Sequence, residues 1–226
     1  MIETNSDSKS ALPRLIAVTA VFGVAAWYTA HPDWIAKLFG SQIPTVFHAQ
    51  ISFFATALIL AVAVPAATYG TDSWKPVLGS LGLGDVKFGT KMLLIGVPIA
   101  ILSGYVGAGS PAIAEVYPLG RDLSMKPAVF GPYMVGYLAY YIAFEFFFRG
   151  MLIFRGPKQD ILTGRNNFQA ILVTVFHIGK PFMELAGALP ASWALGWITI
   201  RTGSIWYALV IHWVVGGSLD FFLLIR

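Results

Sequence analysis

The chain contains 226 residues, of which 57% are hydrophobic and only 12% are charged. Soluble domains carry about 25% charged residues, so this chain has too little polar surface for a soluble enzyme, a nucleic-acid-binding domain or a disordered protein. It contains no cysteine, which excludes disulfides, zinc–thiolate sites, iron–sulfur clusters and thiol nucleophiles. The net charge of +4 suits an integral membrane protein with basic loops.

Seven stretches of the chain are apolar enough to enter a bilayer, whose core requires roughly 20 mostly apolar residues per helix. In chain order they cover 15–30, 47–67, 92–106, 133–154, 168–177, 185–200 and 205–225. The fifth is short, so six to eight spans fit the pattern. The sequence therefore predicts an all-α, polytopic transmembrane bundle, with one domain over residues 15–226 behind a polar cytoplasmic tail at residues 1–14.

Basic residues favour a cytoplasmic N-terminus, because cytoplasmic loops of membrane proteins are enriched in lysine and arginine. The first apolar stretch follows a polar leader without a clear cleavage site, so we expect a retained anchor. With this topology, nine basic loop residues lie inside and five outside. The inside set is Lys9, Arg14, Lys75, Lys87, Lys91, Arg155, Lys158, Arg165 and Arg201, and the outside set is Lys37, Arg121, Lys126, Lys180 and Arg226.

A glutamate and an arginine lie within the fourth predicted span. Glu145 and Arg149 are separated by one helical turn, so their side chains share a face and can pair. A charge at the bilayer centre costs about 2.5–3.5 kcal/mol on insertion scales, and pairing lowers this cost. The pair is either a structural ion pair or part of a functional site.

The fifth predicted span ends at a histidine. His177 is followed by Lys180, Pro181 and Glu184. Because Pro181 has no N–H to donate to the carbonyl of His177, we expect a kink or a helix end here. His177 and Glu184 would share a face if the helix continued, whereas Lys180 can also extend to the membrane interface.

The last predicted span adds a second histidine, His212, with Asp220 further along the same span. Ionisable residues on separate spans usually face a common interior, because charge is costly in lipid. We therefore expect Glu145, Arg149, His177 and His212 to share one polar cavity. Asp220 lies either at the edge of this cavity or near the outer surface.

These residues resemble the motifs of the CPBP family, the intramembrane glutamic proteases that include CAAX-processing and bacteriocin-processing members. The family pattern has two adjacent glutamates, an arginine on the same helix, and one histidine on each of two later helices. Glu145, Arg149, His177 and His212 match it, within a similar region at about 131–220. The resemblance implies a peptidase in which a glutamate activates water and a histidine stabilises the oxyanion or carries the proton.

Two positions depart from the family pattern. Phe144 stands where the family has the glutamate that activates water, and Gly216 stands where an asparagine or aspartate follows the last histidine. A phenylalanine cannot accept a proton, and a glycine has no side chain to donate to an oxyanion. The base would therefore have to be Glu145, oriented by Arg149, or Glu184 from the neighbouring helix.

Two functions remain open. The first is hydrolysis of a peptide bond within or beside the bilayer, and the second is an inactive subunit or scaffold in a larger membrane complex. The candidate catalytic residues are Glu145, Arg149, His177 and His212, and the candidate binding residues are Lys180, Glu184 and Asp220. No H-E-x-x-H spacing accompanies the histidines, so no metal is expected, nor any other cofactor.

The predicted partners follow from the two functions. They are the lipid bilayer and a membrane-protein or peptide substrate for the enzyme, or a larger membrane complex for the subunit, and no nucleic acid. The resemblance implies an integral protein of the bacterial cytoplasmic (inner) membrane.

Overall fold

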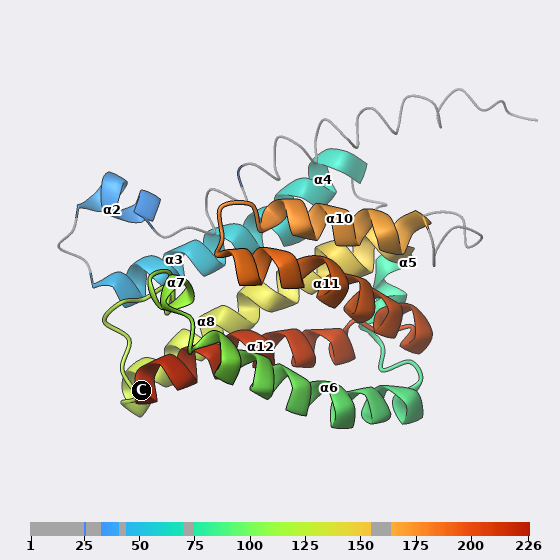
Figure 1. Ribbon diagram of the computed structural model, residues 1–226. Helices are drawn as coiled ribbons and strands as arrows, with labels where there is room; N and C mark the ends of the chain where they lie inside the picture. The colour runs from blue at the N-terminus through green and yellow to red at the C-terminus, as the bar shows by residue number, and fades with distance from the viewer. Residues whose placement is uncertain (1–24, 26–32, 41–43, 70–74, 155–163) are drawn as a thin grey trace, which may run out of the picture.

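The computed structural model describes residues 25, 33–40, 44–69, 75–154 and 164–226 (Figure 1). Every regular element within these ranges is a helix, which confirms the all-α prediction. The expected first span at 15–30 lies outside the described residues except for Ala25. The elements are α2 (Asp33–Phe39), α3 (Thr45–Leu58), η1 (Ile59–Ala63), α4 (Val64–Tyr69), α5 (Lys75–Leu78), η3 (Gly79–Leu81), α6 (Val86–Gly107), α7 (Pro111–Ala114), α8 (Pro127–Glu145), η4 (Phe146–Met151), α9 (Leu152–Phe154), α10 (Asn166–Phe176), α11 (Phe182–Thr202) and α12 (Trp206–Ile225).

Four of the described helical runs are long and apolar enough to cross a membrane: Thr45–Ala66, Val86–Gly107, Pro127–Phe154 and Trp206–Ile225. They match the second, third, fourth and last predicted spans. The fifth predicted span is α10, whose 11 residues are too few to cross a bilayer core. The sixth is α11, a helix of 21 residues that carries Glu184 in its first turn and Arg201 in its last. The chain is an integral, polytopic membrane protein.

Local capping explains why two spans begin earlier than hydropathy predicts. Helix α6 begins at Val86 because the Asp85 side chain accepts a hydrogen bond of 3.0 Å from the Phe88 amide, which satisfies an otherwise free donor. Helix α8 begins at Pro127, where a missing N–H is harmless in the first helical turn. Both starts depend on single polar or proline residues, to which an apolar window does not respond.

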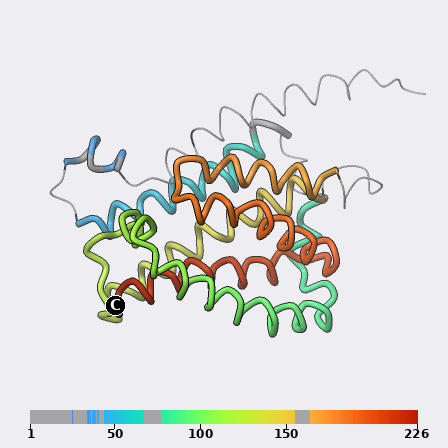
Figure 2. Tube along the Cα trace, viewed as in Figure 1, coloured from blue at the N-terminus to red at the C-terminus, as the bar shows by residue number. Residues whose placement is uncertain are grey.

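The run from α8 to α9 forms the centre of the bundle (Figures 1 and 2). In its most apolar stretch 72% of the residues are buried, against 11% for α6. Helix α3 packs on one side, where Phe53 stacks on Tyr137 with ring centroids 4.6 Å apart. Helix α12 packs on another side in the opposite direction, so its C-terminal half meets the start of α8. Side chains near the end of α8 therefore face the N-terminal half of α12.

Small residues let α6 approach α12. A Cβ atom at Gly89 would collide with the ring of Tyr207, and one at Gly104 would collide with the hydroxyl of Ser218. Close backbone contact of this kind provides the dispersion contacts that hold helices together in lipid. The seam aligns the two helices in parallel and fixes the position of His212 on α12.

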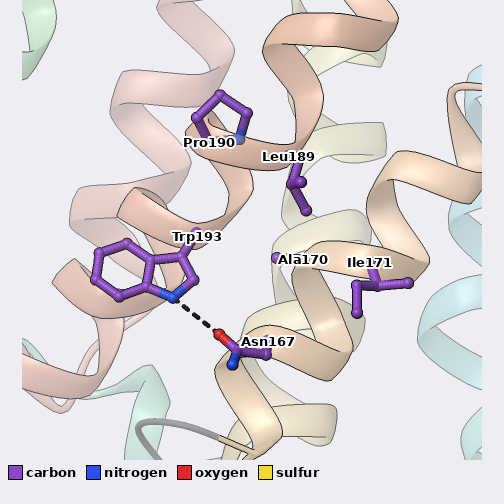
Figure 3. Close-up of a pocket in the computed structure, with 6 residues that line it drawn as sticks. All are labelled: Asn167, Ala170, Ile171, Leu189, Pro190 and Trp193. Carbon is purple, nitrogen blue, oxygen red and sulfur yellow. Dashed lines mark hydrogen bonds between the residues drawn. The ribbon is translucent and has the colours of Figure 1, made fainter.

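Helices α10 and α11 form a hairpin joined by buried polar contacts. Gln169 Nε2 donates to the carbonyl of Ser192 at 2.9 Å, and Asn166 Nδ2 donates to the carbonyl of Trp193 at 3.1 Å. Gly196 leaves the room that these amides occupy. On the outer side of the hairpin, an apolar groove of about 520 Å³ is lined by Asn167, Ala170, Ile171, Leu189, Pro190 and Trp193 (Figure 3).

Candidate active site

Glu145 is the last residue of α8, and a π-helical segment follows it directly. The segment, η4, covers Phe146–Met151, and all six of its residues are buried. Such insertions are rare in helices and occur frequently at functional sites, because the widened turn re-aims side chains. Glu145 and Arg149, on either side of its start, are both 0% exposed. The sequence therefore places two opposite charges in the most enclosed part of the bundle.

Glu145 is held by two partners from different helices. Its Oε1 atom lies 3.1 Å from Nη1 of Arg149 and 2.7 Å from Nδ1 of His212. Arg149 also donates from Nη2 to Oγ of Ser192 on α11 at 3.1 Å. We call Glu145, Arg149, Ser192 and His212 the buried cluster. It joins α8, η4, α11 and α12 through contacts between side chains that are costly to leave unpaired in lipid.

Aromatic rings enclose the carboxylate side of the buried cluster. Phe144, only 1% exposed, lies with its ring 5.4 Å from that of His212 and 5.4 Å from the Arg149 guanidinium carbon. The Tyr141 ring lies 4.5 Å from that of His212. His212 itself keeps 18% of its side chain exposed. The exposed part of this cluster is therefore the imidazole and not the carboxylate.

A second polar group lies at the turn between α10 and α11. Tyr117 donates its hydroxyl proton to Oε1 of Glu184 at 2.8 Å, and Lys180 Nζ donates to the Tyr117 hydroxyl at 3.0 Å. His177 Nδ1 lies 2.7 Å from the carbonyl of Val173, which can only accept, so Nδ1 carries the proton. Its Nε2 lies 3.8 Å from Glu184 Oε1. We call Tyr117, His177, Lys180 and Glu184 the hairpin cluster.

At the turn beside the hairpin cluster, the structure has the helix end, and not the kink, of the two outcomes expected at Pro181. Helix α10 ends at Phe176, and α11 begins after Pro181, so the two are separate helices. Pro181 has no N–H to donate to the carbonyl of His177. That carbonyl instead accepts a hydrogen bond of 3.1 Å from the Lys180 amide. Gly179 allows this reversal because its φ is +92°. His177 and Glu184 thus meet across a turn and not along one helical face.

Burial controls the charge states in the hairpin cluster. Burial, reinforced by the Glu184 charge, raises the pKa of Tyr117 well above its usual value, so the hydroxyl stays protonated and donates. Burial lowers the pKa of Lys180, while the Glu184 charge opposes this shift. The hydrogen bonds therefore run from Lys180 through Tyr117 to the Glu184 carboxyl group.

The two clusters are neighbours in space. Phe176, which precedes His177, packs its ring 5.8 Å from that of Phe144 at the buried cluster. Each histidine has its Nδ1 atom engaged and is partly exposed, at 17% for His177 and 18% for His212. The expected convergence is thus divided between two adjoining clusters.

Asp220 belongs to neither cluster. Its Oδ2 atom accepts from the Tyr133 hydroxyl at 2.9 Å, and the residue is 0% exposed. This position is inside the bundle, near the start of α8, and not at the outer surface. Among the residues that the structure describes, its Oδ1 atom has no hydrogen-bond partner.

Sequence reasoning missed two of the residues that complete the clusters. Ser192 lies within a predicted apolar span, and a hydroxyl there needs a partner, so its position carried a usable signal. Tyr117 lies in a connection between spans, where a tyrosine attracts no attention. Among the described residues, no group of three His, Asp or Glu side chains is arranged to hold a metal ion.

Comparison with known proteins gives a family match to the part of the chain that contains the candidate catalytic residues. Residues 127–217 match the family model described as type II CAAX prenyl endopeptidase Rce1-like. No curated protein and no solved structure matches the chain. The matched range begins with α8 and contains Glu145, Arg149, His177 and His212, but not Asp220. Residues 127–217 of this membrane protein are therefore similar to the CAAX protease-like family.

Proposed function

We propose that the chain is an intramembrane peptidase in which His212, oriented by Glu145, activates the attacking water. The observation that carries this proposal is the 2.7 Å contact between His212 Nδ1 and Glu145 Oε1. A carboxylate at Nδ1 fixes the proton on that nitrogen and leaves the Nε2 lone pair free. The same carboxylate stabilises the imidazolium that forms when Nε2 takes a proton.

Glu145 is better suited to positioning than to direct proton abstraction. Its side chain is 0% exposed, and its Oε1 atom is already paired with the Arg149 guanidinium at 3.1 Å. Phe144, 1% exposed, packs against the Arg149 and His212 side chains that hold Glu145. Glu145 therefore acts through His212, and Arg149 holds Glu145 in place. Ser192 fixes the guanidinium from the facing helix.

The reaction then follows the general acid–base pattern. His212 Nε2 accepts a proton from water as the water oxygen bonds to the peptide carbonyl carbon. When the C–N bond breaks, the imidazolium returns that proton to the leaving amine. The products are a new carboxylate and a new amine, and no other reactant is required.

The test compares cleavage of a membrane-anchored reporter peptide by purified wild type and Glu145→Gln in proteoliposomes. Glu145→Gln should lower kcat by about 10²-fold or more and leave KM nearly unchanged, because Glu145 does not touch the substrate. Glu115→Gln is the matched control, since Glu115 is exposed and outside both clusters. Equal kcat values for wild type and Glu145→Gln would overturn the proposal.

One observation favours the second candidate, an inactive subunit of a membrane complex. Phe144, in the position of the missing glutamate, is packed at 1% exposure, as expected for a residue kept for stability. If wild type cleaves no faster than Glu145→Gln and co-purifies in stoichiometric amount with another membrane protein, the subunit function replaces the enzyme.

A further inference from the structure

We propose that the hydroxyl pair of Tyr137 and Tyr141 is the oxyanion donor of this site. The inference rests on the proposed peptidase function and extends it by assigning a catalytic role to two tyrosines of α8. These hydroxyls would donate a hydrogen bond to the carbonyl oxygen as it becomes negative. They would thereby supply the hydrogen-bond donor that Gly216 lacks.

Position 216 lies one helical turn beyond the proposed base. Gly216 follows His212 by four residues on α12, so a side chain at 216 would point to the same face. A Cβ atom built there would collide with the Tyr141 hydroxyl and lie 2.8 Å from the Tyr137 hydroxyl. The tyrosine hydroxyls thus occupy the space of the absent side chain. They lie beside the backbone of the turn that follows His212.

One of these tyrosines, Tyr141, contacts the imidazole. The Tyr141 ring lies edge-on to the His212 ring at 4.5 Å, and it is buried within the aromatic enclosure. Its hydroxyl donates to the Tyr137 hydroxyl at 3.2 Å, a long bond for two hydroxyl groups. An oxyanion is a stronger acceptor than a neutral hydroxyl. The Tyr141 proton can therefore turn from Tyr137 to the substrate as charge develops.

The first experiment measures kcat and KM for Tyr141→Phe, which keeps the ring and removes the donor. Loss of one oxyanion donor lowers kcat by about 10²–10³-fold, and KM should stay within about twofold. Tyr105→Phe is the matched control, because Tyr105 is exposed on α6. Wild-type kcat in Tyr141→Phe would overturn the inference while leaving the peptidase function intact.

The second experiment moves the donor to α12. Gly216→Asn alone should unfold at a lower temperature, because its Cβ atom collides with the tyrosines. Combined with Tyr141→Ala, which removes the nearer of the two hydroxyls and leaves only the flexible tip of Tyr137 to shift, the asparagine amide should restore kcat at least tenfold over Tyr141→Ala alone. Failure of this rescue, with both variants folded by thermal unfolding, would also overturn the inference.

A binding measurement distinguishes failure of the oxyanion-donor inference from failure of the peptidase function. A phosphinate peptide, whose charged oxygen mimics the tetrahedral intermediate, should bind Tyr141→Phe at least tenfold more weakly than wild type. The parent peptide should bind both equally. If wild type neither cleaves the peptide nor binds the phosphinate, the peptidase function fails and the inference falls with it.

Discussion

Removal of Arg149 would leave a buried carboxylate without its cationic partner. The closest atoms of Arg149 and Glu145 are 3.1 Å apart, and both side chains are 0% exposed. At an effective dielectric constant of about 20, two unit charges at this distance attract by about 5 kcal/mol. Removing one partner of a buried pair typically costs about 3–5 kcal/mol. Arg149→Met should therefore lower the free energy of unfolding by about 3–5 kcal/mol.

A double-mutant cycle distinguishes pairing from lost packing. Glu145→Gln removes the charge that Arg149 would leave behind, so the double variant should recover about 2 kcal/mol relative to the sum of the single variants. Unfolding by SDS in mixed micelles can be followed by the fluorescence of the seven tryptophans. Lys91→Met, at an exposed position on α6, is the matched control and should stay within about 0.5 kcal/mol of wild type. An Arg149→Met variant as stable as wild type would refute the reasoning.

Three further predictions concern the bundle and its orientation. Gly89→Ala should destabilise the α6–α12 seam by about 1–3 kcal/mol through overpacking, whereas Gly131→Ala, with no atom within 4 Å of its Cβ position, should be neutral or stabilising in SDS unfolding. Because the folded state keeps the proton of Tyr117 and the unfolded state loses it above a pH of about 10, wild type should lose stability above that pH more steeply than Tyr117→Phe in pH-dependent unfolding. Since the chain has no cysteine, Lys87→Cys and Arg226→Cys can be labelled singly in intact cells with a membrane-impermeant maleimide. Only Arg226→Cys should react if the N-terminus is cytoplasmic, and the reverse pattern would contradict the predicted topology.

Hydropathy was sufficient to predict the helical class and four spans, because a bilayer imposes length and apolarity on any helix that crosses it. It could not locate the start of α6, where Asp85 caps the helix, or the start of α8 at Pro127. It also placed the fifth span at 168–177, whereas α10 begins at Asn166 and ends at Phe176. Helix ends depend on individual side chains, which a window average hides.

The candidate site could be predicted at the positions where an unpaired charge in lipid would be costly. The spacing of Glu145 and Arg149 indicated their ion pair, and the cost of charge in lipid indicated that His212 would face a polar partner. The division into two clusters was not predictable, because it depends on how the α10–α11 turn places Glu184. Neutral partners such as Tyr117 and Ser192 gave weaker signals, since a hydroxyl is tolerated in many environments.

The role of His212 as base is tested most directly by kcat at saturating reporter peptide for wild type and His212→Gln. General base catalysis contributes about 10²–10⁴-fold, so kcat should fall by that factor while the reporter still binds. His48→Gln, at a histidine on α3 outside both clusters, should retain wild-type kcat. A folded His212→Gln variant that cleaves the reporter at the wild-type rate would contradict the mechanism.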